Sequence, residues 1–144
     1  YHDVPPVLCY PNQLSQVFIN LMKNAIEAMK DKEERKLFIE VYASREEIVT
    51  GQDDTQKDNG GAQECIVIKI KDSGGGIPKE MRETIFEPFV TTKGVLHGGD
   101  ETTPGTGLGL SIVYGIIQRH QGKIHIDVQD GIGTTFVIVL PVLK

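Results

Sequence analysis

The sequence is poor in cysteine and in long apolar runs, and each shortage excludes a class of protein. Its two cysteines, Cys9 and Cys65, are too few for a disulfide framework and lack metal-ligand spacing. Both lie among apolar neighbours, so we expect buried, unreactive thiols in a reducing compartment. No apolar run reaches about 18 residues, and the N-terminus lacks the features of a signal peptide. We therefore expect a cytoplasmic domain without membrane contact, and the sequence leaves open whether a longer parent protein is membrane-anchored.

Basic residues are not in excess either. The net charge is −5, from 20 acidic and 15 basic residues. The whole excess lies in residues 46–64, outside which 14 acidic residues stand against 14 basic ones. A balanced surface without a basic stripe argues against nucleic acid as a partner, and the acidic segment is expected to be a solvated loop.

The length and composition are those of one globular domain. The chain has 144 residues, of which 39% are hydrophobic, enough to build one core. It has no initiator methionine. We therefore expect residues 1–144 to be a single, monomeric domain cut from a longer chain.

The first half of the chain predicts one helix and two strands. Apolar residues recur at three- and four-residue steps in residues 11–32, which indicates a helix, and Asn12 is its expected N-cap. Alternating, β-branched residues predict strands over 36–44 and 65–72. The polar, glycine-bearing stretch between them is expected to be a long loop.

The second half predicts two more helices and a hairpin. We expect a short helix over 78–89, a lid-like segment without periodicity over 90–107, and a helix over 108–122 closed by Gly122. A strand, a glycine-containing turn and a second strand follow in 123–141. This order predicts an α+β, two-layer α/β sandwich, in which a mixed, mostly antiparallel sheet is covered on one face by three helices.

Two glycine clusters suggest a nucleotide. In "GTGLGLSIV", Gly105, Gly107 and Gly109 lead into a helix, whose first N–H groups and partial positive charge suit phosphates. The same pattern also fits a flexible linker, and it is neither a P-loop nor a dinucleotide-binding fingerprint.

The other cluster, "DSGGGIP", follows a strand directly. The Asp72 carboxylate could accept a hydrogen bond from an exocyclic amine such as adenine N6, and Gly74 and Gly76 would let a base approach the backbone. The alternative is an ordinary turn in which Asp72 caps the next segment.

The first predicted helix carries a polar band beside its apolar stripe. Asn20 and Asn24 lie one turn apart in this band, with Gln16 and Glu27 on the same side. Asparagine is mildly unfavourable in mid-helix, and its carbonyl oxygen is a suitable ligand for Mg²⁺. A solvated polar face is the alternative interpretation.

Four motifs in this order resemble a known family. They resemble the N box, first glycine box, phenylalanine box and second glycine box of sensor histidine kinases, and they read "NLMKNAIEAM", "DSGGGIP", "FEPFVTTK" and "GTGLGLSIVYGII". That family belongs with DNA gyrase, Hsp90 and the mismatch-repair ATPases, which share the Bergerat-type sandwich with a mobile ATP lid. The sequence is most similar to the nitrogen-regulation and sporulation-kinase branch.

The resemblance implies a role for each matching position. Asn24 would hold Mg²⁺ with Asn20 in support, so that both count as catalytic, and Asp72 would accept from adenine N6. The remaining positions implied to bind ATP or ADP are Gly74, Gly76, Ile77, Thr92, Lys93, Gly105, Thr106, Gly107, Leu108, Gly109, Leu110 and Thr134.

The sequence departs from the family pattern at several places. Glu27 stands where many members have a basic residue, and Val90 and Thr91 replace a common Tyr-Arg pair. The lid is also longer than the minimal spacing. Neutralisation of phosphate charge would then depend on Lys93, with help from Lys23.

Asn20 bears on the fate of the γ-phosphate. Gyrase and Hsp90 relatives have at this position a glutamate that activates or orients water, and a neutral amide cannot accept a proton as a carboxylate can. The resemblance thus implies transfer to a histidine, although a gyrase-type hydrolase and a binding-only regulatory module stay open. None of the four histidines lies in the family's phosphoacceptor motif; they are His2, His97, His120 and His125. The implied partners are an upstream dimerisation and phosphoacceptor domain and a response regulator.

Overall fold

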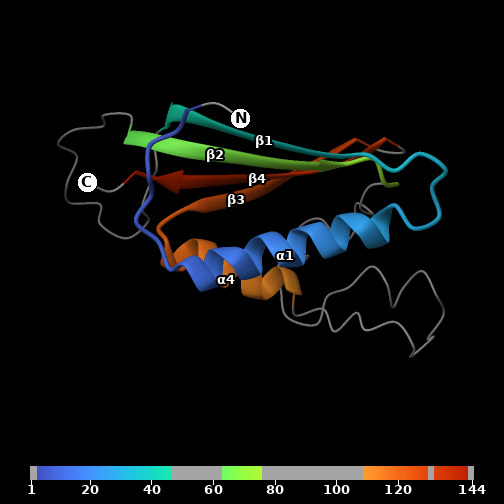
Figure 1. The fold of residues 1–144 in the computed structure, drawn as a ribbon, viewed down its shortest axis with the longest axis horizontal. Helices are drawn as coiled ribbons and strands as arrows, with labels where there is room; N and C mark the ends of the chain where they lie inside the picture. Colours follow the sequence, from blue (N-terminus) through green and yellow to red (C-terminus); the bar gives the residue numbers. More distant parts are fainter. Residues whose placement is uncertain (1–2, 47–62, 76–108, 130–131, 143–144) are drawn as a thin grey trace.

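A four-stranded sheet with two helices on one face makes up the described part of the molecule (Figure 1). The computed structural model describes residues 3–46, 63–75, 109–129 and 132–142. In chain order the elements are α1 (Pro11–Ala28), β1 (Leu37–Glu46), β2 (Gln63–Asp72), α4 (Gly109–Arg119), β3 (Lys123–Gln129) and β4 (Gly133–Pro141).

The strands lie in the order β1-β2-β4-β3, and each strand is antiparallel to its neighbours. The α+β sandwich is confirmed, and the described sheet is antiparallel throughout. The expected helix over 78–89 and the lid over 90–107 lie outside the described residues. Neither described helix has the length and apolar character that crossing a membrane requires.

The alternation of side chains divides the sheet into two faces. One face packs against both helices and forms the main core, in which Ile138 of β4, Val17 and Leu21 of α1 and Val113 of α4 have no exposed surface. A smaller cluster on the opposite face consists of Cys65, Val67, Val137 and Val139, flanked by Tyr42. Cys65 is buried as expected, Cys9 is half-buried, and neither forms a disulfide.

Helix α1 begins two residues earlier than an Asn12 cap requires. Tyr10 is the N-cap in an extended conformation, Pro11 occupies the first helical turn, and no side chain caps the helix. The Tyr10 carbonyl accepts the N–H groups of Gln13 and Leu14 at 3.0 and 3.1 Å. The Asn12 prediction was wrong because proline, whose fixed φ suits the first helical position, sets the boundary here.

The end of α4 also differs from the prediction in detail. Gln121, with φ of 57°, takes the left-handed conformation that was expected of Gly122. A Cβ on Gly122 would lie 2.6 Å from the Val139 carbonyl oxygen, so glycine is required there by close packing against β4. The Gly122 N–H donates to the Ile117 carbonyl at 3.0 Å, which closes the helix.

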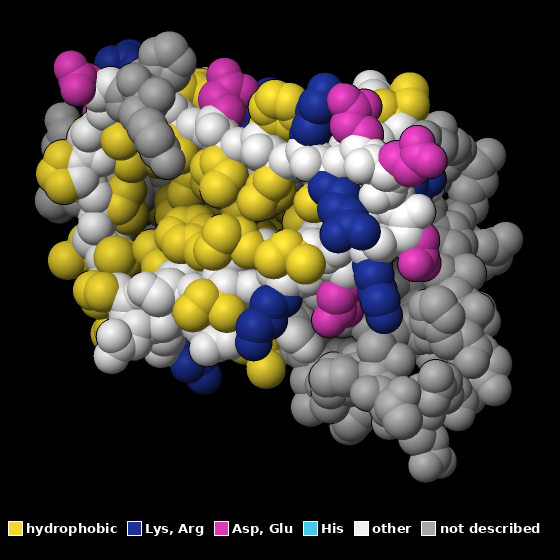
Figure 2. All heavy atoms as spheres, turned by 45° about the vertical axis from the view of Figure 1, so that its right-hand side comes forward, with side chains coloured by type: hydrophobic (Ala, Val, Ile, Leu, Met, Phe, Trp, Pro, Cys, Tyr) yellow, Lys and Arg dark blue, Asp and Glu magenta, His cyan; other side chains and the backbone are white. Residues whose placement is uncertain are grey.

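Apolar side chains are also exposed where β1 begins. Leu37, Phe38 and Ile39 are 37%, 57% and 45% exposed on this edge strand. Figure 2 shows hydrophobic side chains gathered over the middle of one face, with charged side chains around the edges of that face. The connection between α1 and β1 is charged, and in it Lys36 pairs with Glu34.

Candidate functional site

Asp72 is the polar residue at the end of a row of apolar side chains on β2. Ile66, Ile68 and Ile70 of β2 face the helices, and Asp72 continues the same alternation at the end of the strand. Its cross-strand partner is Thr134, which ends the matching row on β4. Both are buried, Asp72 to 3% and Thr134 to 4% exposure. The structure therefore brings together two predicted site residues that lie 62 positions apart.

The surroundings of Asp72 disfavour its charge. Burial raises the pKa of this carboxyl above its ordinary value, and backbone hydrogen bonds from Gly74 and Thr134 act in the opposite direction. The Gly74 N–H donates to Asp72 Oδ1 at 2.8 Å. A carboxylate has about four lone-pair sites, so two N–H groups leave it able to accept from an amine.

Gly74 has a packing reason to be glycine. A Cβ there would lie 2.9 Å from the Ala28 carbonyl oxygen and equally close to Asp72 Oδ1. The turn after β2 therefore fits directly against the last residue of α1. The sequence pointed to close approach of a base at this glycine, and the structure shows close approach of a helix.

Asn20 joins α1 to the beginning of α4. Its Nδ2 donates to the Gly109 carbonyl at 3.2 Å, and its Oδ1 accepts from Gln16 Nε2 at 2.7 Å. Both ends of the amide thus have protein partners. Gln16 had been noted only as part of the polar band, and its spacing of four residues from Asn20 was the signal for this contact.

Asn24 lies one turn beyond Asn20 and is half-buried. Within the described part of the chain its amide makes no hydrogen bond, and no group of three or more His, Cys, Asp or Glu side chains could hold a metal. Such a donor set fits a magnesium ion that takes one neutral oxygen from the protein and its other ligands from phosphates and water.

Helix α1 links the two ends of the candidate site. At its middle, Asn20 contacts the start of α4; at its last residue, Ala28 contacts the turn that follows Asp72. These two points are eight residues apart, or about 12 Å at 1.5 Å per residue. That separation is comparable with an extended nucleoside triphosphate, and half-buried Asn24 lies midway along it.

The other predicted site residues divide into two groups. Gly109 and Leu110 open α4, where the Leu110 side chain packs against the core and leaves only its backbone as a candidate ligand. Those that lie outside the described residues are Gly76, Ile77, Thr92, Lys93, Gly105, Thr106, Gly107 and Leu108.

His120 is committed to a structural contact. It is 7% exposed, its Nδ1 lies 2.7 Å from the Ile116 carbonyl, and its Nε2 accepts the Tyr10 N–H at 3.0 Å. The carbonyl calls for a proton on Nδ1 and the Tyr10 N–H for a lone pair on Nε2, so both ring nitrogens are occupied. The Tyr10 ring also meets it edge-on, at 5.6 Å between centroids. No sequence pattern pointed to this pairing across 110 residues.

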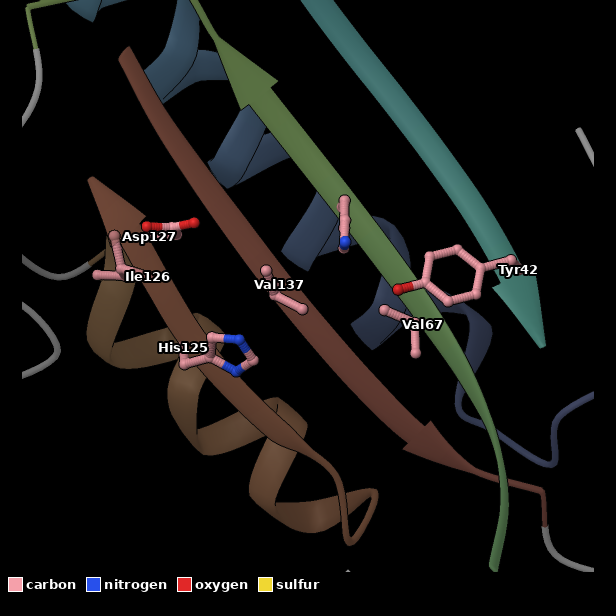
Figure 3. A pocket seen from close by; sticks show the side chains of 7 residues that line it. Tyr42, Val67, His125, Ile126, Asp127 and Val137 are labelled. Atoms are coloured by element: carbon pink, nitrogen blue, oxygen red, sulfur yellow. The ribbon is translucent and has the colours of Figure 1, made fainter. Parts of the chain in front are cut away.

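His125 lies on the opposite face of the sheet. Ile124 and Ile126 pack toward the helices, so the exposed His125 between them points the other way. There it borders a shallow groove with Tyr42, Lys69 and Asp127, seen in Figure 3 with the helices behind the strands. Lys69 Nζ lies 5.4 Å from the centre of the Tyr42 ring. Neither described histidine is therefore placed to receive a phosphoryl group from the candidate site.

Comparison with known proteins agrees with this arrangement. Residues 9–144 match the family described as histidine kinase-, DNA gyrase B- and HSP90-like ATPases. The chain belongs to this family. It is 39% identical over 140 residues to sporulation kinase E of Bacillus subtilis, covering 97% of this chain and 15% of that protein. It is 40% identical over 142 residues to the histidine kinase/phosphatase NtrB of Rhodobacter capsulatus, covering 97% of this chain and 35% of NtrB.

Solved structures place the chain among histidine kinase catalytic domains. The nucleotide-free catalytic domain of histidine kinase ThkA is 32% identical, with a TM-score of 0.65 over 96% of this chain and 73% of that one. The mycobacterial sensor histidine kinase MprB is 26% identical, with a TM-score of 0.67 over 94% and 76%. The predicted kinship with sporulation and nitrogen-regulation kinases is confirmed. The chain spans well under half the length of the curated relatives it matches.

Proposed function

We propose that this domain binds Mg²⁺–ATP and donates the γ-phosphate to a histidine of a separate dimerisation and phosphoacceptor domain. The observation that carries the proposal is the position of α1 between a buried carboxyl at the end of β2 and the first residue of α4. Asp72, with Thr134 beside it, would recognise adenine. The N–H groups at the start of α4 would bind the phosphates.

Magnesium has a natural place in this arrangement. Asn24 would supply its protein oxygen, midway between the two ends of the site. The bound ion would neutralise charge on the phosphates during transfer. The residues of the chain itself would hold the base, orient the triphosphate along α1 and keep its end near the start of α4.

Transfer is favoured over hydrolysis by the contacts of Asn20. Its carbonyl oxygen accepts from Gln16 and its amide nitrogen donates to Gly109, so the side chain holds two elements together. A neutral amide so engaged does not activate water, a contribution typically worth about 10²–10⁴-fold. Phosphoryl transfer needs mainly positioning and charge neutralisation.

The receiving histidine would come from outside the described residues. His120 has both ring nitrogens occupied and His125 lies across the sheet. We infer that a phosphoacceptor domain in the same parent protein provides the nucleophile and that a response regulator takes the phosphoryl group from it. Family membership and the similarity to sporulation kinase E support this inference.

Asn24→Ala tests the proposal. We expect it to lower phosphorylation of a separately supplied phosphoacceptor domain by about a hundredfold or more, because the triphosphate loses its positioning. Labelled ATP and detection of phosphohistidine give the readout. Asn12→Ala is the matched control, since Asn12 is exposed in the first turn of the same helix. Full transfer by the Asn24 variant would refute its assignment.

A further inference from the structure

We propose that Gln16 is a positioning residue, which fixes the orientation of the Asn20 amide and thereby the place where α4 begins. This inference rests on the proposed function, because the beginning of α4 is where the phosphates would bind. Gln16 is exposed on α1. Among the described residues, its side chain hydrogen-bonds to Asn20 and makes no hydrogen bond to α4 or to the proposed ligand-binding residues.

The contact chain has a defined direction. Gln16 Nε2 donates to Asn20 Oδ1 at 2.7 Å, and Asn20 Nδ2 donates to the Gly109 carbonyl at 3.2 Å. An asparagine side chain has one accepting and one donating end. Because Gln16 engages the accepting end, the donating end faces α4. If the amide turned over, its oxygen would face the Gly109 carbonyl, and two acceptors would repel each other.

The position of the Gly109 carbonyl affects where the first turn of α4 lies. Gly109 is the first residue of α4, so a shift of its carbonyl moves the N–H groups of the first turn. The nearest atom that a Cβ on Gly109 would meet is Asn20 Nδ2, at 4.0 Å. Misplacement of a binding group by about 1 Å can cost about a hundredfold in rate. A contact that holds α4 against α1 thus acts on the phosphate end of the site.

The hydrogen bond of Gln16 can be removed without disturbing the hydrophobic core. Val17 and Leu21 provide the core contacts of the same stretch of α1 and have no exposed surface, whereas Gln16 is exposed. Gln16→Met keeps the length and helix propensity of the side chain and removes only its hydrogen-bonding amide. The substitution is therefore expected to leave the core intact.

The experiment compares ATP with adenosine, which lacks phosphates. By calorimetry on the chain, Gln16→Met should weaken ATP binding about tenfold and leave adenosine binding unchanged. Gln118→Met is the matched control: Gln118 is exposed near the far end of α4 and should affect neither ligand. A general loss of structure would weaken both ligands together, and unfolding curves of each variant check this.

A double-mutant cycle tests whether Gln16 acts through Asn20. In an Asn20→Leu background, Gln16→Met should cause no further loss of ATP affinity, because the Asn20 amide through which Gln16 acts is already absent. Additive losses, equal losses for ATP and adenosine, or unchanged ATP affinity in Gln16→Met would each overturn the inference. If the unmodified chain failed to bind ATP, the proposed function would fall and this inference with it. If it binds ATP and Gln16→Met binds equally well, only the role of Gln16 fails.

Discussion

At the scale of single residues, Asp72 combines a stability cost with a proposed binding role. The carboxyl ends an apolar row and is 3% exposed, so its charge is poorly solvated. Backbone N–H groups of Gly74 and Thr134 compensate only in part, and the pKa of Asp72 stays above its ordinary value of 3.8. A buried carboxyl that costs stability is typical of a residue kept for binding.

Asp72→Asn should therefore stabilise the chain at neutral pH. With a raised folded-state pKa, the folded protein keeps its Asp72 proton to higher pH than the unfolded chain. The contribution of Asp72 to stability is consequently largest below 3.8 and is lost as pH rises through the folded-state pKa. Urea unfolding across this range should show a difference between variant and wild type that grows with pH. A variant less stable at every pH would contradict the expectation.

The same substitution should change base recognition. We expect Asp72→Asn to weaken ATP binding about tenfold, because a charge-assisted hydrogen bond to the adenine amine is lost. Inosine triphosphate has a carbonyl in place of that amine, and the new amide could donate to it. Preference for ATP over inosine triphosphate should therefore fall in the variant. Calorimetry with both nucleotides checks this, and an unchanged preference would remove Asp72 from the proposed pocket.

At the scale of elements, α1 and α4 are held side by side and antiparallel. Asn20 reaches the start of α4, and Tyr10, just before α1, meets His120, just after α4 ends. Val17 of α1 and the α4 core residues lie along the helices between these two polar contacts, and Leu21 follows directly after Asn20. Hydrogen bonds are directional, so the two contacts set the relative position of the helices along their length, which apolar packing leaves less strictly defined.

His120→Ala should weaken this helix pair. We expect the free energy of unfolding to fall by about 1–3 kcal/mol, because the Tyr10 N–H loses its acceptor and the buried ring leaves a space. His125→Ala is the matched control: His125 is exposed on β3, and its loss should cost at most about 0.5 kcal/mol. Chemical denaturation of both variants gives the comparison. Equal effects would show that His120 does not hold the helices together.

At the scale of the whole molecule, the described residues of the proposed site include groups that would bind ATP but no histidine that would accept its phosphate. The Asp72 carboxyl, the asparagines of α1 and the start of α4 all lie on the side of the sheet that the helices cover. His125 lies on the opposite side. The domain should therefore hold ATP without consuming it until another domain presents a histidine.

The chain alone should hydrolyse ATP slowly. We expect its phosphate release to be about 10²–10⁴-fold below that of a gyrase-type ATPase, because Asn20 supplies no base. Addition of a phosphoacceptor domain should produce phosphohistidine without a matching rise in free phosphate. A coupled phosphate assay measures the first quantity and labelled ATP the second. Steady turnover at the level of a gyrase-type ATPase would support the hydrolytic alternative.

Local sequence patterns were sufficient to predict most of the described helices and strands. The 3.6-residue period of α1, the alternation of β2 and β4, and the glycine turn before Gly133 depend on neighbours in sequence, so each element was predicted within a few residues. The place of Asp72 at the end of an apolar row was visible in the same alternation. The boundary error at Asn12 came from a competing local signal, proline at the first helical turn. Gly122 closes α4 as predicted, but the left-handed residue is Gln121, one position before it.

By itself, the sequence determined the α+β class, the family and the identity of the candidate residues, because period and motif are local properties. Only the tertiary structure decided which of them meet: Asp72 with Thr134, Gly74 with Ala28, and Gln16 and Asn20 with Gly109. It also decided that His120 is buried with both ring nitrogens engaged. Such contacts join residues up to 110 positions apart and depend on how helices pack on the sheet, and no local pattern encodes that geometry.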